Sequence, residues 1–258
     1  MKFLVIDAST RNGFTRHASE KYYELLGNVD KSIVRISDLI IDPCIGCNIC
    51  LRKPESECPH YSDDCKYILD LILEADAIIY FIPNFSLNIP GKLKMLFDRL
   101  AFVFHRPRLF GKVSTCFVVE GVYGGKNIIK YHNELMSFWG SNIIKGEIIK
   151  GGLSYKNEFI NEELIKLFQK NIRKLQNKLN SNLYQSPTLF RLMIFRMTRS
   201  SMKYFDEATP VDKAYYKAKG WNDSTYYYPV KMNIFKILIG YLFDNIIIFM
   251  SKKKPTTA

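Results

Sequence analysis

The segment KFLVIDASTRNGFTR, residues 2–16, contains the start of an α/β fold. Lys2–Asp7 is a short apolar run typical of a buried strand, and Arg16–Leu26 follows with helical periodicity. Between them, the turn Ser9–Thr15 contains hydroxyl groups, a guanidinium and a glycine. Such a turn directs backbone N–H groups at a small volume, as in many phosphate sites of α/β proteins. An ordinary turn with Thr15 as the helix N-cap explains the same residues, and both interpretations stay open on this segment alone.

The succession of strand and helix recurs through the first 180 residues. Further strands are predicted at Ser32–Ile36, Ala77–Pro83, Val113–Glu120 and Asn142–Ile149. Helices are predicted at Lys66–Ala75, Lys92–Phe102 and Lys126–Trp139, and a last one carries Ile160, Leu164, Phe168, Ile172, Leu175 and Leu179 on one face. Strands that alternate with helices in this way predict a parallel sheet covered by helices on both faces.

Composition and charge narrow the class of protein. The chain has 258 residues, of which 47% are hydrophobic, and its 37 basic and 25 acidic residues give a net charge of +12. This charge favours anionic ligands. No recognised nucleic-acid-binding module accompanies it, so we expect no nucleic-acid partner. No segment resembles a signal peptide, and the six cysteines therefore indicate metal binding or free thiols in a reducing cytoplasm, in preference to disulfides.

Four cysteines are concentrated in one predicted loop. Cys44, Cys47, Cys50 and Cys58 follow the spacing C-x2-C-x2-C-x7-C, and Pro59 comes directly after the fourth. A compact run of thiolates that ends in Cys-Pro is typical of iron–sulfur sites. Free or redox-active thiols explain the same residues. Zinc is the third alternative, although zinc sites usually separate two ligand pairs more widely. His60 is a further candidate ligand.

Three motifs later in the chain carry a resemblance to a known family. ADAIIYFIPNF at residues 75–85, IPGKLK at 89–94 and FDR at 97–99 resemble the NADPH-dependent FMN reductase family and its relatives, the iron–sulfur flavoproteins. The resemblance covers residues 1–150. It implies a flavodoxin-like, three-layer αβα fold with a five-stranded parallel sheet of order 2-1-3-4-5. FMN then binds at the carboxyl ends of the strands, where the order switches.

The resemblance also implies the residues of the FMN site. The phosphate would be bound by Ser9, Arg11, Asn12, Gly13, Phe14 and Thr15. The isoalloxazine ring and ribityl chain would be lined by Pro83, Asn84, Phe85 and Ser86. The pyrimidine end of the ring would meet the loop Glu120, Gly121, Val122, Tyr123, Gly124 and Gly125.

This sequence departs from the family at two of those positions. Phe85 stands where the family often has Tyr, and Glu120 places a carboxylate where small or neutral residues are commoner. Such a carboxylate would make an anionic reduced flavin more costly to form, unless Glu120 is only a solvated residue at a strand end. For the pair Asp98-Arg99 we expect an ion pair or a helix cap, and for His17, His60, His105 and His132 surface or helix-face positions rather than a catalytic base.

The residues beyond Ser181 have another character. They contain no strand pattern, and we expect residues 1–180 to form the FMN-binding domain and residues 181–258 a helical extension packed on that domain or in a dimer interface. From Asn233 to Met250, Lys236, Gly240 and Asp244 form one narrow stripe on a helix that is otherwise apolar. A membrane span needs about 20 predominantly apolar residues and resists such charges. Burial in the protein or in a homodimer is therefore favoured over docking on a membrane surface aided by Lys252–Lys254, and over a true span.

We therefore expect an FMN-dependent oxidoreductase of the cytoplasm. It would accept hydride from NAD(P)H and pass electrons to a flavin, quinone, metal or protein, with no obligatory side-chain acid or base. The alternative is an iron–sulfur flavoprotein with a [4Fe-4S] cluster on the cysteine loop, which carries electrons from a ferredoxin-like partner.

Overall fold

The computed structural model describes residues 1–151, 160–204 and 209–252, and the chain divides into two compact units. The first unit contains residues 1–45 and 60–183, and the second contains residues 46–59 and 184–258. Residues 46–59, which hold three of the cysteines, therefore group with the C-terminal part of the chain and not with their neighbours in sequence.

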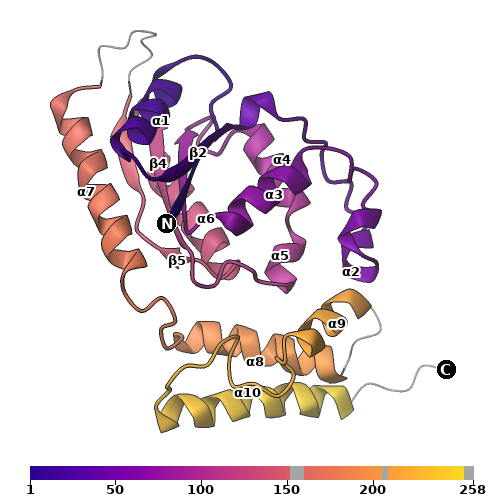
Figure 1. The fold of residues 1–258 in the computed structure, drawn as a ribbon. Coiled ribbons are helices and arrows are strands. Elements are labelled where there is room, and N and C mark those ends of the chain that lie inside the picture. Colours follow the sequence, from indigo (N-terminus) through magenta and orange to yellow (C-terminus); the bar gives the residue numbers. More distant parts are fainter. Residues whose placement is uncertain (152–159, 205–208, 253–258) are drawn as a thin grey trace. The chain divides into compact units, whose positions relative to one another are not determined.

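The first unit is built on a parallel sheet (Figure 1). The order β2-β1-β3-β4-β5 is the expected 2-1-3-4-5, and β6 pairs with β4 beyond β5. The strands are β1 (Lys2–Asp7), β2 (Asp30–Arg35), β3 (Ala77–Pro83), β4 (Val113–Glu120), β5 (Asn142–Ile143) and β6 (Glu147–Lys150). Every residue of β3 is buried, because helices cover both faces of this central strand.

The expected fifth strand, Asn142–Ile149, is interrupted. Ser114 of β4 pairs with Ile143, and Phe117 of β4 pairs with Glu147. The neighbouring edge segment therefore advances by four residues where β4 advances by three. One extra residue opposite a regular strand is a β-bulge. Gly146 lies in this bulge, where a Cβ atom would come within 2.5 Å of Cys116 Sγ. The close approach of the two backbones thus separates the predicted single strand into β5 and β6.

Helices cover both faces of the sheet, as the alternation of strands and helices predicted. The helices of the first unit are α1 (Phe14–Leu25), α3 (Cys65–Glu74), α4 (Gly91–Arg99), α5 (Phe102–His105), α6 (Gly125–Phe138) and α7 (Glu162–Leu179). Helices α1 and α7 pack on the face that includes Phe81 and Phe117. Helices α4 and α6 pack on the opposite face, where Tyr80 contacts Phe97 and His132. Adjacent residues of β3 therefore serve two separate cores.

The second unit is helical in its described residues. Its helices are α2 (Ile49–Arg52), α8 (Leu189–Tyr204), α9 (Pro210–Ala218) and α10 (Ile234–Lys252). Helix α2 lies against α9, and α8 lies against α10. Phe195 of α8 packs on the rings of Tyr226 and Tyr227, and Trp221 packs on Tyr216. The aromatic residues crowded between 215 and 228 thus contribute to the core of this unit.

Within the described part of the chain, no helix is long and apolar enough to cross a membrane.

Candidate functional site

A pocket lies at the carboxyl ends of β1 and β3, where the strand order switches. Its lining residues are Ser9, Thr10, Arg11, Gly13, Phe14, Thr15, Pro83, Asn84, Phe85, Val119 and Gly151. Eight of these are among the predicted FMN contacts. The structure thus brings the turn after β1 and the start of the loop after β3 to one cavity.

The turn after β1 is held by Asp7, the last residue of that strand. The Asp7 side chain is fully buried, and its Oδ1 accepts a hydrogen bond of 2.9 Å from the backbone N–H of Ser9. Burial raises the pKa of Asp7, while Arg16 Nε lies 3.6 Å from its Oδ2. Asp7 is not among the predicted site residues, although a carboxylate that ends a buried strand before a polar turn is a recognisable signal for turn formation.

Two features of this turn suit an anion. Ser9 is 4% exposed, and its hydroxyl has no hydrogen-bond partner among the described residues. A buried hydroxyl without a partner is unusual, because an unmade hydrogen bond costs about 1–3 kcal/mol. In addition, α1 begins at Phe14 with Gly13 as its N-cap and no side-chain capping hydrogen bond. Thr15 lies inside the helix, so the interpretation of Thr15 as N-cap is wrong.

The loops after β3 and β4 are joined to each other. Asn84 Nδ2 donates to the carbonyl oxygen of Tyr123 at 2.7 Å, and the Asn84 backbone N–H donates to Val119. Gly124 has φ +109°, and a Cβ atom there would lie 2.9 Å from Asn84 Nδ2. Glycine at this position therefore permits both the backbone conformation and the contact between the loops. Of the predicted contacts, Asn12, Ser86, Glu120, Gly121, Tyr123, Gly124 and Gly125 do not line the pocket.

The tip of the loop after β3 is a tight two-residue turn. Phe85 and Asn88 exchange backbone hydrogen bonds of 2.9 Å across Ser86 and Leu87, which have φ +49° and +66°. Left-handed conformations at non-glycine residues cost about 1–3 kcal/mol each and concentrate at functional sites. Phe85 is 42% exposed at the base of this turn and presents an aromatic ring at the pocket.

Glu120 is not the solvated strand-end residue that one interpretation proposed. Its side chain is 4% exposed, and Oε2 accepts a hydrogen bond of 2.6 Å from the Gly125 backbone N–H at the start of α6. Lys150 Nζ donates to Glu120 Oε1 at 2.6 Å and to the Val122 carbonyl. The ammonium group of Lys150 lowers the pKa of Glu120. The carboxylate therefore orders the loop 121–124 as a paired charge.

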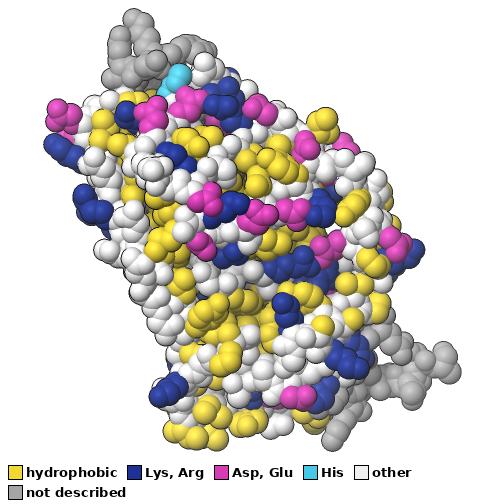
Figure 2. Space-filling model, in the orientation of Figure 1, with side chains coloured by type: hydrophobic (Ala, Val, Ile, Leu, Met, Phe, Trp, Pro, Cys, Tyr) yellow, Lys and Arg dark blue, Asp and Glu magenta, His cyan; other side chains and the backbone are white. Residues whose placement is uncertain are grey.

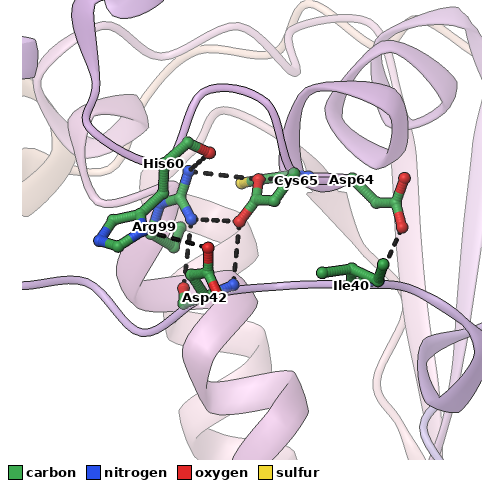
Figure 3. Close-up of polar contacts among 7 residues, drawn as sticks. Ile40, Asp42, His60, Asp64, Cys65 and Arg99 are labelled. Carbon is green, nitrogen blue, oxygen red and sulfur yellow. Dashed lines mark hydrogen bonds and ion pairs between the residues drawn. The ribbon is translucent and has the colours of Figure 1, made fainter.

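A buried ion pair holds the stem of the cysteine loop (Figure 3). The side chains of Arg99 and Asp63, 4% and 3% exposed, form an ion pair. Arg99 also donates to the carbonyl oxygens of Asp42 and His60, at 3.2 and 2.8 Å. The backbone on both sides of residues 43–59 is thereby fixed by one guanidinium. Of the pair Asp98-Arg99, for which an ion pair or a helix cap was expected, Arg99 pairs with Asp63 and Asp98 pairs with Lys94.

The pair Asp63-Asp64 completes this stem. Asp63 accepts from the backbone N–H groups of Asp42 and Cys65, both at 2.9 Å, and Asp64 accepts from Ile40 at 2.6 Å. Carboxylates that bind backbone N–H groups hold a segment in a fixed path. The short stretch before the first loop cysteine is therefore tied to the start of α3.

The loop cysteines are accessible thiols. Cys44 and Cys47 are exposed, Cys50 and Cys58 are half-buried, and none is in a disulfide. Cys44 belongs to the first unit and the other three belong to the second. Among the described residues, no group of three or more His, Cys, Asp or Glu side chains is arranged to hold a metal ion. His60, the further candidate ligand, places its Nδ1 3.1 Å from Asp42 Oδ2.

His132 lies on a helix face, as expected, but it is completely buried. Its ring contacts Tyr80 with a centroid distance of 4.8 Å, and burial lowers its pKa to about 4. Cys116, inside β4, is also buried. Neither side chain lines the pocket.

Comparisons with known proteins agree with this architecture. A family model described as NADPH-dependent FMN reductase matches residues 1–151. An iron–sulfur flavoprotein of Archaeoglobus fulgidus is 29% identical over 189 residues, which cover 73% of this chain and 83% of that protein.

Solved structures share the fold at low sequence identity. RosB with bound 8-demethyl-8-formylriboflavin-5'-phosphate has a TM-score of 0.57 at 14% identity, over 91% of this chain and 92% of its own. The NAD(P)H:quinone oxidoreductase from Methanothermobacter marburgensis has a TM-score of 0.51 at 17% identity, over 68% of this chain and 98% of its own.

Proposed function

The chain belongs to the NADPH-dependent FMN reductase family and is an FMN-dependent oxidoreductase, and on this basis we propose that it takes hydride from NAD(P)H and passes electrons to a small-molecule or protein acceptor. The observation that carries the proposal is the pocket at the ends of β1 and β3, where, among the described residues, the buried Ser9 hydroxyl has no hydrogen-bond partner and no side chain caps α1. When bound there, FMN supplies the hydride and electron chemistry.

The residues of the turn after β1 fit the phosphate of FMN. A phosphate oxygen would satisfy the buried Ser9 hydroxyl, and the amino-terminal end of α1 favours a negative charge. Arg11, which lines the same pocket, adds a guanidinium, a group that binds phosphate by charge-assisted hydrogen bonds. Asp7 holds the turn in place from beneath through its bond to Ser9.

The loops after β3 and β4 suit the ring of the cofactor. Phe85 presents an exposed aromatic ring for stacking, and Asn84 fixes the distance between the two loops. Glu120 is neutralised by Lys150, which removes the penalty that a free carboxylate would impose on an anionic reduced flavin. We therefore assign Glu120 the role of positioning residues 121–124 along the pyrimidine end of the ring.

The phosphate assignment is tested by replacing Arg11 with Ala. Loss of one charge-assisted contact, worth about 1.5–3 kcal/mol, should weaken FMN binding by about 10- to 100-fold. Arg173→Ala, at an exposed position of α7, is the matched control for the loss of one guanidinium. Flavin fluorescence titration measures both variants, and equal FMN affinity for Arg11→Ala and the wild type would contradict the assignment.

The hydride donor is tested separately, by following flavin absorbance after anaerobic mixing with NADPH or NADH. The proposed reductase is reduced by at least one of them within the time of a catalytic cycle. The protein could instead bind FMN, be reduced by neither nucleotide and accept electrons from a reduced ferredoxin. That result would exclude NAD(P)H-dependent reductase activity and favour the electron carrier.

An iron–sulfur electron carrier is the second candidate, supported by the cysteine spacing and by the name of the A. fulgidus relative. The donor set of Cys44, Cys47, Cys50 and Cys58 has the chemistry that a [4Fe-4S] cluster requires. Cys47→Ser should then remove iron and long-wavelength absorption while FMN stays bound, whereas Cys116→Ser, at a buried thiol outside the loop, should keep the iron. Anaerobically purified protein without iron and acid-labile sulfide would exclude the cluster and leave the four cysteines as free thiols or zinc ligands.

We further propose the cytoplasm as the compartment. None of the six cysteines forms a disulfide in the described part of the chain, and a reducing environment disfavours disulfides.

A further inference from the structure

Helix α10 exposes apolar side chains along one continuous face. Its exposed positions recur at helical spacing and include eight large apolar or aromatic residues and one polar residue, Asn245. The eight are Ile234, Phe235, Leu238, Tyr241, Leu242, Ile246, Phe249 and Met250, and each is between 41% and 70% exposed. Soluble proteins rarely leave an apolar patch of this extent open to water unless it binds something. These eight residues are termed the apolar face of α10.

The opposite side of α10 carries the charges. Asp244 forms ion pairs with Arg196 at 2.8 Å and with Arg199 at 2.5 Å, both from α8. Ser200 also donates to Asp244, at 2.7 Å. Gly240 leaves room for the Arg196 guanidinium, because a Cβ atom at this position would lie 3.1 Å from Arg196 Nε. The narrow stripe recognised in the sequence therefore faces α8 and fixes α10 with its apolar face outward.

In the sequence, lysines precede and follow this helix. Lys231 precedes α10, and Lys252–Lys254 stand at its end in the sequence. Residues 184–258 contain 12 Lys and Arg but only 5 Asp and Glu, so this quarter of the chain carries more than half of the net charge of +12. A second copy of the chain would bring a surface of the same charge against this one. An anionic surface would be attracted to it.

We propose that the apolar face of α10 docks on the surface of an anionic lipid bilayer. The helix lies in the plane of the interface, its apolar face enters the boundary between headgroups and acyl chains, and the net positive charge of residues 184–258 attracts anionic headgroups. Figure 2 shows hydrophobic side chains at the surface over the part of the molecule where Figure 1 places α10. The Asp244 ion pairs stay within the protein, so the helix docks without spanning the bilayer.

Sedimentation with lipid vesicles tests the proposal on the chain of 258 residues loaded with FMN. The wild type should pellet with phosphatidylcholine vesicles that contain phosphatidylglycerol, and less with phosphatidylcholine alone or at high salt. Phe235→Ser combined with Leu242→Ser should lower the bound fraction by at least about tenfold, because both side chains are apolar contacts of the interface. Tyr67→Ser, at an exposed aromatic of α3, is the control and should bind as the wild type does.

Three results would overturn the proposal. In the first, the wild type does not pellet with either kind of vesicle. In the second, the double variant pellets as well as the wild type. In the third, vesicles bind neither protein, and sedimentation equilibrium shows that the wild type is a dimer whereas the double variant is a monomer. Circular dichroism and retained FMN confirm folding of the variants. If the double variant does not fold, Leu238→Asn alone provides the same comparison.

Discussion

Helices α7 and α10 have nearly the same length, 18 and 19 residues, but they are packed in opposite ways. Helix α7 buries Leu164, Phe168, Ile172 and Leu175, and its exposed residues are all polar or charged. Helix α10 faces its neighbour α8 with Gly240 and Asp244 and exposes eight large apolar or aromatic residues, although Ile247 is buried. The side that a helix presents to its neighbour thus depends on what that neighbour offers, which is an apolar sheet for α7 and two arginines for α10.

This contrast implies two sources of stability in one chain. The first unit relies on apolar burial against its sheet. The contact of α8 with α10 relies on ion pairs between largely buried side chains. The two tryptophans allow the units to be followed separately, because Trp139 is buried in the first and Trp221 in the second. Trp221→Phe leaves Trp139 as the reporter, and Trp139→Phe leaves Trp221.

Phe168→Ala should have the largest effect on the first unit. Phe168 is fully buried and packs on Tyr22, Phe81 and Phe117. Its removal leaves a cavity and should lower the free energy of unfolding by about 3–5 kcal/mol. Urea denaturation with Trp139 as reporter measures this change. If the Trp221 signal moves by as much, the two units unfold together and the distinction between them is lost.

Asp244→Ala should have a comparable effect on the second unit. The substitution leaves Arg196 and Arg199 side by side without their shared carboxylate, and breaking a buried ion pair of this kind costs about 3–5 kcal/mol. The transition reported by Trp221 should shift to lower urea. Asp223→Ala, at the 85% exposed partner of Lys203, is the matched control and should change little. A null effect at Asp244 would show that apolar packing alone holds α10.

His132 tests how the first unit treats a buried polar group. Burial lowers its pKa to about 4, while the unfolded chain has a value of about 6.5. Between these values the unfolded chain binds a proton that the folded protein does not, so stability is lost as the pH falls from about 6.5 to about 4, by up to about 3 kcal/mol. The variant His132→Gln should lack this part of the pH dependence. Parallel stability profiles for the wild type and the variant would contradict the assignment.

The smallest effect is expected for Leu242→Ser on the apolar face of α10. Leu242 is 57% exposed, so its replacement should change the free energy of unfolding by less than about 0.5 kcal/mol in the absence of lipid. Leu175→Ser, at a fully buried position of α7, is the matched change on the other helix and should cost several kcal/mol, on the order of a core truncation. A large loss at Leu242 without lipid would mean that the apolar face is already covered in the free protein.

The sequence by itself determined the elements whose pattern is local. Completely apolar runs such as Ala77–Pro83 identify central strands, because a parallel strand buried on both faces has no polar side. The stripe from Leu164 to Leu175 predicted the face that α7 buries, because helical period and burial coincide. The turn Ser9–Thr15 was recognisable because its residues and its place between strand and helix are neighbours in sequence.

Only the tertiary structure decided which distant groups meet. The sequence gives no signal that Arg99 pairs with Asp63, that Lys150 neutralises Glu120, or that His132 is completely buried, since each depends on elements far apart in the chain. The bulge at Gly146 arises from the approach of Cys116 on the next strand. The domain boundary at residue 180 stays a prediction. The same holds for whether the cysteine loop binds a cluster, binds zinc or has free thiols.

The same reason explains α10. Its sequence showed a polar stripe on an otherwise apolar helix. This pattern alone favoured burial of the apolar sides in the protein or in a homodimer. In the structure, Arg196 and Arg199 meet Asp244, and a buried charge without a partner would cost more than apolar side chains in contact with water. A local pattern defines the faces of a helix, but the groups contributed by other elements determine which face is turned inward.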